Sequence, residues 1–110
     1  MNITHGIDII QLNREELKDL SFAKRFMTNN EYAVFLSLGN NFEQQKRYTA
    51  AIWSLKEAII KATNHKFLFS KIEINLSNNA APKCNIDNIN LSLSYEIDYI
   101  IGSAIYIKND

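Results

Sequence analysis

Hydrophobic and polar residues alternate along residues 3–10, and this alternation predicts a first strand. One face of the strand carries three isoleucines, Ile3, Ile7 and Ile9. The opposite face carries Gly6 and Asp8. We therefore expect the Asp8 carboxylate near the end of this strand, on the same face as Gly6.

A helical period follows, and capping residues divide it into three segments. The predicted helices cover residues 13–26, 28–39 and about 40–63. Asn13 followed by Glu16 predicts the first N-cap. Thr28 and Glu31 have the spacing of a capping box, which explains both residues by structure alone. Asn40 or Asn41 caps the third and longest helix.

After the third helix the period changes from about 3.6 residues to two, which indicates strands. The predicted strands cover residues 72–76, 89–94 and 99–108, and the last two are close enough to form a hairpin. Residues 77–82 predict a turn. The order of one strand, three helices and then antiparallel strands predicts an α+β fold in a single domain over residues 1–110.

The third helix has two contrasting faces. Its apolar stripe is formed by Ile52, Leu55, Ile59 and Ala62, and we expect this stripe in the core. Opposite it, Ser54, Glu57 and Lys61 form a narrow polar strip. Because Glu57 and Lys61 are one helical turn apart, the pair is either an ordinary solvated ion pair or part of a site.

Lys56 projects into the apolar arc of the same helix, where a charge needs a partner. Two interpretations stay open from the pattern alone. Either the methylene chain lies along the edge of the core and the ammonium reaches water, or the ammonium contacts a phosphate.

Composition limits the function classes. The chain has 110 residues, 46% of them hydrophobic, and its 12 basic and 12 acidic residues cancel. The balanced charge does not favour binding to nucleic acid or an anionic membrane. No apolar run approaches the roughly 18 residues of a membrane span. With a lone Cys84 and no secretory pattern at the start, we expect a cytoplasmic protein.

Four motifs in register resemble one family. Residues 53–62, WSLKEAIIKA, are similar to the signature helix of phosphopantetheinyl transferases. Gly6, Asp8 and Arg14 have the spacing found in the short holo-acyl-carrier-protein synthase type of this family. Residues 25–31, RFMTNNE, and the serine strand 92–94 followed by Tyr99 resemble two further family motifs. Together they cover the chain nearly from end to end.

The resemblance implies an activity and a fold, the 4'-phosphopantetheinyl transferase fold. Such an enzyme moves the phosphopantetheine arm of coenzyme A to a serine of an acyl carrier protein. Asp8 and Glu57 would hold magnesium, and Lys61 would neutralise or protonate the leaving phosphate. Lys56 would contact the phosphates or orient the carboxylates, and Ser92 and Ser94 would bind coenzyme A. The proton of the serine would go to Glu57 or to a metal-bound water.

The resemblance also implies partners. Acyl carrier proteins are acidic, so three basic residues of the first helix are candidates for docking them: Arg14, Lys18 and Arg25. Relatives work as homotrimers with active sites between subunits, and covering the apolar strand at residues 100–105 favours the same assembly. His5, His65 and Cys84 have no ligand or nucleophile spacing, so we expect structural or surface roles for them.

Two departures from the family pattern affect the coenzyme A side. Tyr95 stands where the family has a histidine, and a tyrosine does not carry a positive charge near neutral pH. Residues 63–67, TNHKF, replace the usual glycine-rich turn. We therefore expect another basic residue to hold the 3'-phosphate, with four candidates: Lys46, Arg47, His65 and Lys66. The alternative function is a non-catalytic module that binds a carrier protein or a nucleotide.

Overall fold

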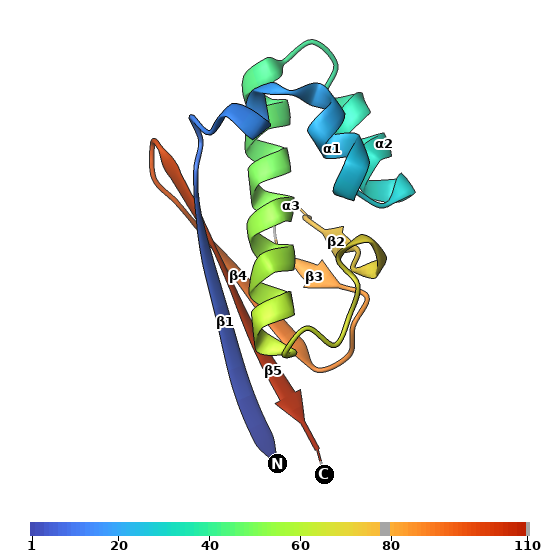
Figure 1. Cartoon of the computed structure of the whole chain (residues 1–110), viewed down its shortest axis with the longest axis vertical. Coiled ribbons are helices and arrows are strands. Elements are labelled where there is room, and N and C mark those ends of the chain that lie inside the picture. The colour runs from blue at the N-terminus through green and yellow to red at the C-terminus, as the bar shows by residue number, and fades with distance from the viewer. Residues whose placement is uncertain (78–79, 110) are drawn as a thin grey trace.

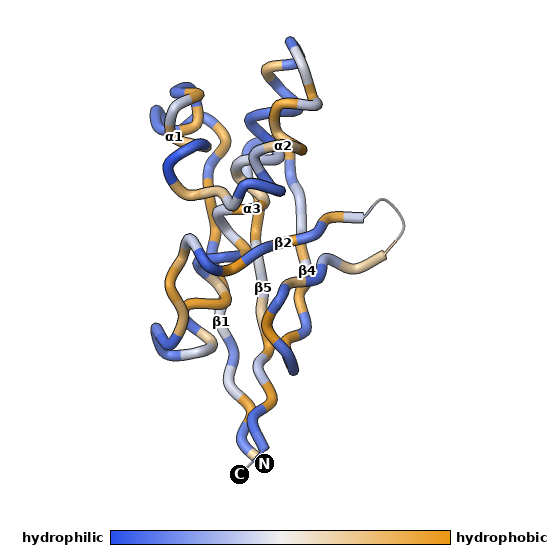
Figure 2. Tube along the Cα trace, turned by 90° about the vertical axis from the view of Figure 1, so that its right-hand side faces the viewer, coloured by the Kyte–Doolittle hydropathy of each residue, from blue (hydrophilic) through white to orange (hydrophobic). Residues whose placement is uncertain are grey.

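The computed structural model describes residues 1–77 and 80–109 of the chain. Three antiparallel strands in the order β1-β5-β4 form a sheet, and the long helix α3 lies along one face of it (Figure 1). The bounds are β1 Asn2–Gln11, β4 Ile89–Tyr95, β5 Tyr99–Lys108 and α3 Phe42–Ala62. Coloured by hydropathy, the strands carry both hydrophobic and hydrophilic positions (Figure 2). The predicted α+β fold is confirmed.

The remaining elements cover the side of α3 that faces away from the sheet (Figure 1). They are the 3-10 turn η1 (Glu15–Lys18), helices α1 (Leu20–Phe26) and α2 (Asn29–Ser37), the 3-10 turn η2 (Phe69–Lys71), and strands β2 (Ile74–Asn75) and β3 (Lys83–Cys84). The predicted core stripe of α3 is confirmed, since Ile52, Leu55 and Ile59 are fully buried. Because the sheet covers one side of α3 and the shorter elements cover the other, the helix is held in place against the sheet.

Two glycines of the sheet let α3 approach closely. A Cβ atom at Gly6 would collide with the carbonyl oxygen of Ala58, and one at Gly102 would lie 2.7 Å from the carbonyl carbon of Ser54. Ser54 is consequently buried against β5. The predicted polar strip of Ser54, Glu57 and Lys61 therefore runs from a buried end at Ser54 to a half-exposed end at Lys61, because the sheet covers the helix at Gly102.

The first predicted helix, residues 13–26, is wrong in its start and its continuity. The chain forms the short turn η1 and then α1, and Asn13 caps neither. Asp19, which separates the two, has an extended backbone and accepts a hydrogen bond from the Ser21 amide at 3.0 Å. Such local side-chain bonds compete with helix propagation, which explains the break.

The other two helices agree with their predicted caps. In the capping box of α2, the Thr28 amide donates to Glu31 at 2.9 Å and the Glu31 amide donates to Thr28 at 3.2 Å. Asn41 caps α3 by accepting from the Gln44 amide at 3.0 Å. The ends fall within a residue or two of expectation. Among the described residues, no helix combines the length and the apolar character that crossing a membrane requires.

The strand predicted at residues 72–76 is much shorter, since only β2 forms there. It pairs with β3 in a separate two-stranded sheet, with Ile74 opposite Cys84. The predicted hairpin of β4 and β5 is confirmed, and Ser92 pairs with Ser103 in it. The turn predicted at residues 77–82 lies partly outside the described residues.

The outer face of the three-stranded sheet is unusually apolar. Isoleucines from β1 and β5 are exposed there by 39–58%: Ile3, Ile7, Ile9 and Ile105. Gly6 and Asp8 lie on the opposite face of β1, toward α3. The alternation predicted for residues 3–10 is therefore confirmed, and it is the polar-looking face that meets the helix.

Candidate active site between β1 and α3

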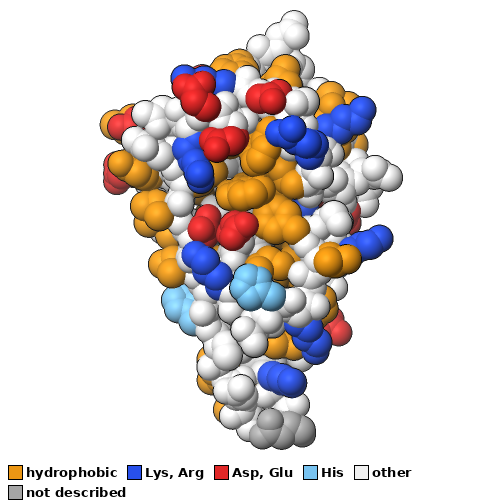
Figure 3. All heavy atoms as spheres, viewed as in Figure 1, with side chains coloured by type: hydrophobic (Ala, Val, Ile, Leu, Met, Phe, Trp, Pro, Cys, Tyr) orange, Lys and Arg blue, Asp and Glu red, His pale blue; other side chains and the backbone are white. Residues whose placement is uncertain are grey.

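The predicted site residues Asp8, Glu57 and Lys61 come together between β1 and α3. Gly6 lets the helix close on the strand, and Asp8 follows two residues later on the same face. The Lys61 ammonium donates to the Ile7 carbonyl oxygen at 2.8 Å and to Asp8 Oδ1 at 3.4 Å. On this face of the molecule, acidic and basic side chains gather beside an apolar patch (Figure 3).

The two carboxylates influence one another. Burial raises the pKa of Asp8, although Lys61 beside it acts in the opposite direction. Burial also raises the pKa of Glu57, and the negative charge of Asp8 adds to the rise, whereas Lys61 and His65 lower it. The two carboxylates therefore share one partly buried site, and positive charge from Lys61, Arg14 and His65 acts on them.

Two neighbouring, partly buried carboxylates fit a divalent cation. Magnesium takes oxygen ligands and is commonly bound by one or two carboxylates together with waters and substrate phosphates. Asp8 and Glu57 are such a pair. No group of three or more His, Cys, Asp or Glu side chains gathers around a possible metal within residues 1–77 and 80–109, so two carboxylates are what this part of the chain offers.

The structure does not bring Lys56 to this site. Its ammonium forms an ion pair with Glu31 Oε1 at 2.7 Å and donates to the Phe26 carbonyl oxygen at 3.1 Å. The two side chains are 0% and 1% exposed. A direct contact between Lys56 and a phosphate, or with the Asp8 and Glu57 carboxylates, is therefore wrong for this structure. The partner that its apolar surroundings demand is Glu31.

Glu31 has a second role besides capping α2. Its Oε2 accepts from the Ile74 amide at 2.6 Å, while Oε1 accepts from the Thr28 amide and pairs with Lys56. The Lys56 ammonium also lies 5.7 Å from the Phe26 ring centre. The pair thus joins α1, α2, α3 and β2 behind the site.

Ser92 and Ser94 are exposed on β4 and lie on the outer face of the sheet. They pair with Ser103 and Ile101 of β5, whereas their neighbours Leu91 and Leu93 face the core. They point away from the Asp8 carboxylate of the same chain. The coenzyme A contact predicted for them stays a prediction, and within one chain it does not adjoin the carboxylate pair.

Of the three predicted docking residues, only Arg14 lines an apolar hollow, which Glu16 also lines. Arg14 lines a cavity of about 110 Å³ together with Ile10, Leu17, Phe22 and Trp53, and its charge lowers the pKa of Asp8. All three have partners within the chain, since Arg14 lies 3.7 Å from Glu16, Lys18 pairs with Glu15 at 3.3 Å, and Arg25 lies over the Phe22 ring. The hollow was missed because it forms only where Trp53 of α3 packs beside residues 10–22.

The residues expected to be structural lie apart from one another. His5 Nε2 lies 3.0 Å from Ser103 Oγ across β1 and β5. The thiol of Cys84 contacts the Ile86 carbonyl oxygen, and burial raises its pKa, which disfavours the reactive thiolate. Of these three residues, His65 is the one close enough to the candidate site to influence it, since it lowers the pKa of Glu57.

Known proteins resemble the chain over nearly its whole length. Residues 4–104 match the model of the 4'-phosphopantetheinyl transferase superfamily. The chain belongs to this superfamily. A Mycoplasma genitalium protein named holo-[acyl-carrier-protein] synthase is 48% identical over 105 residues, which cover 91% of this chain and 90% of that protein. A protein of the same name from Ureaplasma parvum serovar 3 is 38% identical over 114 residues, covering 100% and 98%.

Solved structures share the fold. A holo-(acyl-carrier-protein) synthase from Bacillus anthracis in complex with CoA (3',5'-ADP) superposes with a TM-score of 0.79, at 27% identity and covering 93% of each chain. The holo-ACP synthase of Plasmodium yoelii gives a TM-score of 0.80 at 23% identity over 100% of both chains, which supports the fold alone. The family predicted from the motifs is confirmed.

Proposed function

We propose that the chain transfers the 4'-phosphopantetheine group of coenzyme A to a serine of an apo-acyl carrier protein. The observation that carries this proposal is the convergence of Asp8, Glu57 and Lys61 between β1 and α3 in a member of this superfamily. In the reaction the serine oxygen attacks the phosphorus next to the pantetheine arm. The pyrophosphate P–O bond breaks, and adenosine 3',5'-bisphosphate leaves.

The residues divide the work of phosphoryl transfer. Asp8 and Glu57 hold magnesium, which when bound neutralises negative charge on the phosphate oxygens. Lys61 places its ammonium beside Asp8, where it compensates charge on the leaving phosphate. The serine proton goes to Glu57 or to a water molecule.

The carrier protein docks beside these residues. Arg14 stands at the rim of the apolar hollow and acts on Asp8, so a carrier bound there presents its serine to the carboxylate pair. An acidic carrier suits Arg14, with Lys18 and Arg25 further along the same surface. Trp53, one turn before Glu57 on α3, supplies an apolar wall for the contact.

The working form is a homotrimer with active sites between subunits, in the cytoplasm. The support is the outer face of the sheet, where exposed isoleucines of β1 and β5 form an apolar surface that a neighbouring copy would cover. Ser92 and Ser94 lie on this same face. In such an assembly they contact coenzyme A bound next to a neighbouring subunit's carboxylates. Ile7→Asp should then yield monomers in sedimentation, whereas trimers of this variant would contradict the proposal.

The decisive test measures transfer directly. The protein is mixed with coenzyme A, magnesium and an apo-acyl carrier protein, and the carrier is weighed by mass spectrometry. The expected result is a carrier heavier by one phosphopantetheine group, with no gain when a chelator removes magnesium. An unmodified carrier, with a known transferase succeeding in parallel, would overturn the proposal and favour a module that binds without turnover.

A further inference from the structure

A second, basic cavity lies beyond Lys61, at the end of α3. Its volume is about 580 Å³, and Lys61, Lys66, Lys108 and His5 are among the residues that line it. Lys108 reaches it because β5 pairs with β1 in a register that sets Lys108 opposite Asn2. Basic and histidine side chains are visible over this lower half of the molecule (Figure 3).

The positive charge of this cavity is poorly compensated by the protein. None of the described residues lining it is Asp or Glu. In the part of the chain that the structure describes, Asp8 pairs with Lys61, and no carboxylate pairs with Lys66 or Lys108. Like charges that face one cavity repel each other, and a bound anion removes that cost.

Backbone amides of the loop are not available to bind such an anion. Asn64 and His65 turn the chain with φ angles of 54° and 60°. The amides of residues 64, 65 and 66 donate to carbonyl oxygens of Lys61, Ile60 and Thr63 at 2.9–3.3 Å. The helix end also carries partial negative charge. Recognition of an anion therefore depends on the lysine side chains.

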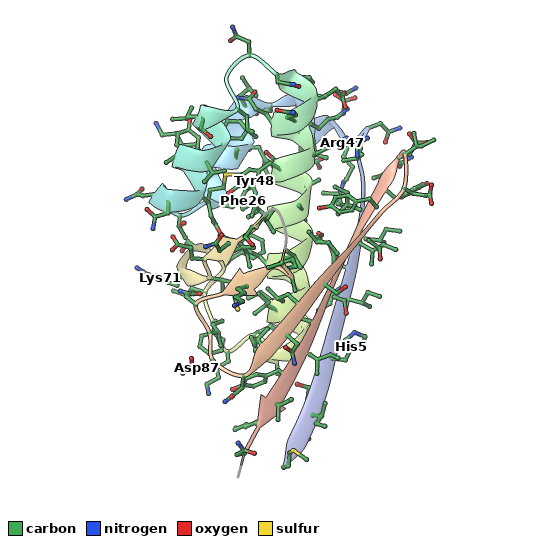
Figure 4. All side chains as sticks on the ribbon, turned by 180° about the vertical axis from the view of Figure 1, so that it is seen from behind. His5, Phe26, Arg47, Tyr48, Lys71 and Asp87 are labelled. Atoms are coloured by element: carbon green, nitrogen blue, oxygen red, sulfur yellow. The ribbon has the colours of Figure 1, made fainter. Side chains whose placement is uncertain are left out.

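The four basic residues proposed from the sequence for the 3'-phosphate differ in where they lie relative to the carboxylate pair. Lys46 is neutralised by Glu43 at 2.9 Å. Arg47 precedes Glu57 by ten residues, about 15 Å along the helix, and lies toward the opposite end of the molecule from His5 (Figure 4). His65 acts on Glu57, whereas Lys66 lines the basic cavity. Lys61 connects that cavity to Asp8.

We infer that this cavity binds the 3'-phosphate of the coenzyme A donor through Lys66 and Lys108. The inference rests on the proposed function for the identity of the ligand. A donor with its pyrophosphate at Asp8, Glu57 and Lys61 directs a second phosphate into the adjoining cavity. The two lysines thus supply the positive charge that Tyr95 does not, and they distinguish coenzyme A from donors without a 3'-phosphate.

Calorimetry on the full-length chain tests this without turnover. The wild type is expected to bind adenosine 3',5'-bisphosphate at least about tenfold more tightly than adenosine 5'-monophosphate. Lys66→Ala and Lys108→Ala should each reduce that preference, and the double variant should abolish it. Lys71→Ala is the matched control, since this exposed lysine lies across the molecule from His5 (Figure 4). It should keep the preference.

Turnover then separates the two proposals. Lys66→Ala/Lys108→Ala should lower kcat/KM for coenzyme A about tenfold and leave that for dephospho-coenzyme A within about twofold. A wild type that binds both nucleotides equally, or a preference that survives in the double variant, would overturn the inference. A wild type that prefers the bisphosphate but modifies no carrier would overturn the proposed function and leave the cavity assignment standing.

Discussion

The helix α3 carries two lysine–carboxylate pairs that differ in every physical respect. The Lys56–Glu31 pair is 0% and 1% exposed with a 2.7 Å contact, whereas in the Lys61–Asp8 pair the side chains are 49% and 18% exposed and 3.4 Å apart. In the first pair each oxygen of Glu31 also accepts a backbone amide. In the second, a further carboxylate, Glu57, is close enough for the charge of Asp8 to raise its pKa.

The difference shows which lysine is free to act on a ligand. A buried pair whose hydrogen bonds are all made resists change, because breaking it leaves a charge without water. In the partly exposed pair, the Lys61 ammonium can move to a ligand at little structural cost, because water replaces the contact that it leaves. The signature helix thus contains a fully buried lysine, Lys56, and a half-exposed lysine, Lys61, five residues apart.

The largest expected effect follows from breaking the buried pair. Lys56→Met leaves the Glu31 carboxylate buried without its partner and should lower the free energy of unfolding by about 3–5 kcal/mol. Urea denaturation measures this. The matched control, Lys61→Met, should cost no more than about 1 kcal/mol because that pair is exposed to solvent.

A double variant keeps this prediction testable even if Lys56→Met does not fold. Glu31→Gln/Lys56→Met has no uncompensated buried charge, so it should recover a large part of the stability lost by the single variant. Equal stability of Lys56→Met and Lys61→Met would contradict the contrast between the two pairs.

Sequence patterns predicted the part of the site that depends on local spacing. Asp8 shares a strand face with Gly6, and Glu57 and Lys61 are one turn apart, so short-range periodicity was sufficient. The capping box of Thr28 and Glu31 was predictable for the same reason. The order of strands and helices also followed from a change of period, which fixes the type of each element better than its ends.

The first predicted helix was wrong for a local reason, the Asp19–Ser21 bond, whereas the other errors at the site concern contacts between distant segments. The helical pattern placed Lys56 in an apolar arc but contained no sign that Glu31, from another helix, would be its partner. The burial of Ser54 depends on Gly102 of the last strand. Lys108 joins the basic cavity only through the register of β5 with β1. Such pairings are decided by tertiary packing, which periodicity within one segment does not report.

The second prediction concerns the partly exposed pair Lys61–Asp8 and the neighbouring carboxylate Glu57. Glu57→Gln should reduce phosphopantetheine transfer by about 100-fold or more, the loss typical when one group that stabilises the transition state is removed. An amide is a poor magnesium ligand, although it preserves size and hydrogen bonding. The free energy of unfolding should change by no more than about 0.5 kcal/mol, since Glu57 is only partly buried.

The matched control is Glu96→Gln, a carboxylate in the exposed turn between β4 and β5. This variant should transfer phosphopantetheine at the wild-type rate. Initial rates at saturating coenzyme A measure both variants. Turnover of Glu57→Gln near the wild-type level would remove Glu57 from the magnesium site.

The smallest expected effect is a pH dependence of the free energy of unfolding that is caused by the titration of Asp8. Since burial raises its pKa, the folded chain takes up a proton at a higher pH than the unfolded chain does. The stability contributed by this group therefore falls as the pH rises through the raised pKa, and it is least favourable at neutral pH. Asp8→Asn removes this cost, so the variant should be more stable than the wild type at neutral pH.

The advantage of Asp8→Asn should shrink as the pH falls from the raised pKa to the ordinary aspartate range, because the wild-type carboxyl is then protonated in both states. Thermal unfolding midpoints across this pH range, without magnesium, measure the effect. Asp87→Asn, an exposed carboxylate after β3, is the control and should show no such trend.

Added magnesium should stabilise the wild type and not Asp8→Asn, since only the wild type keeps both carboxylates that bind the ion. If Asp8→Asn is less stable than the wild type at neutral pH, the contact between Lys61 and Asp8 stabilises the fold more than the burial of Asp8 destabilises it. The Lys61–Asp8 pair would then resemble the buried Lys56–Glu31 pair.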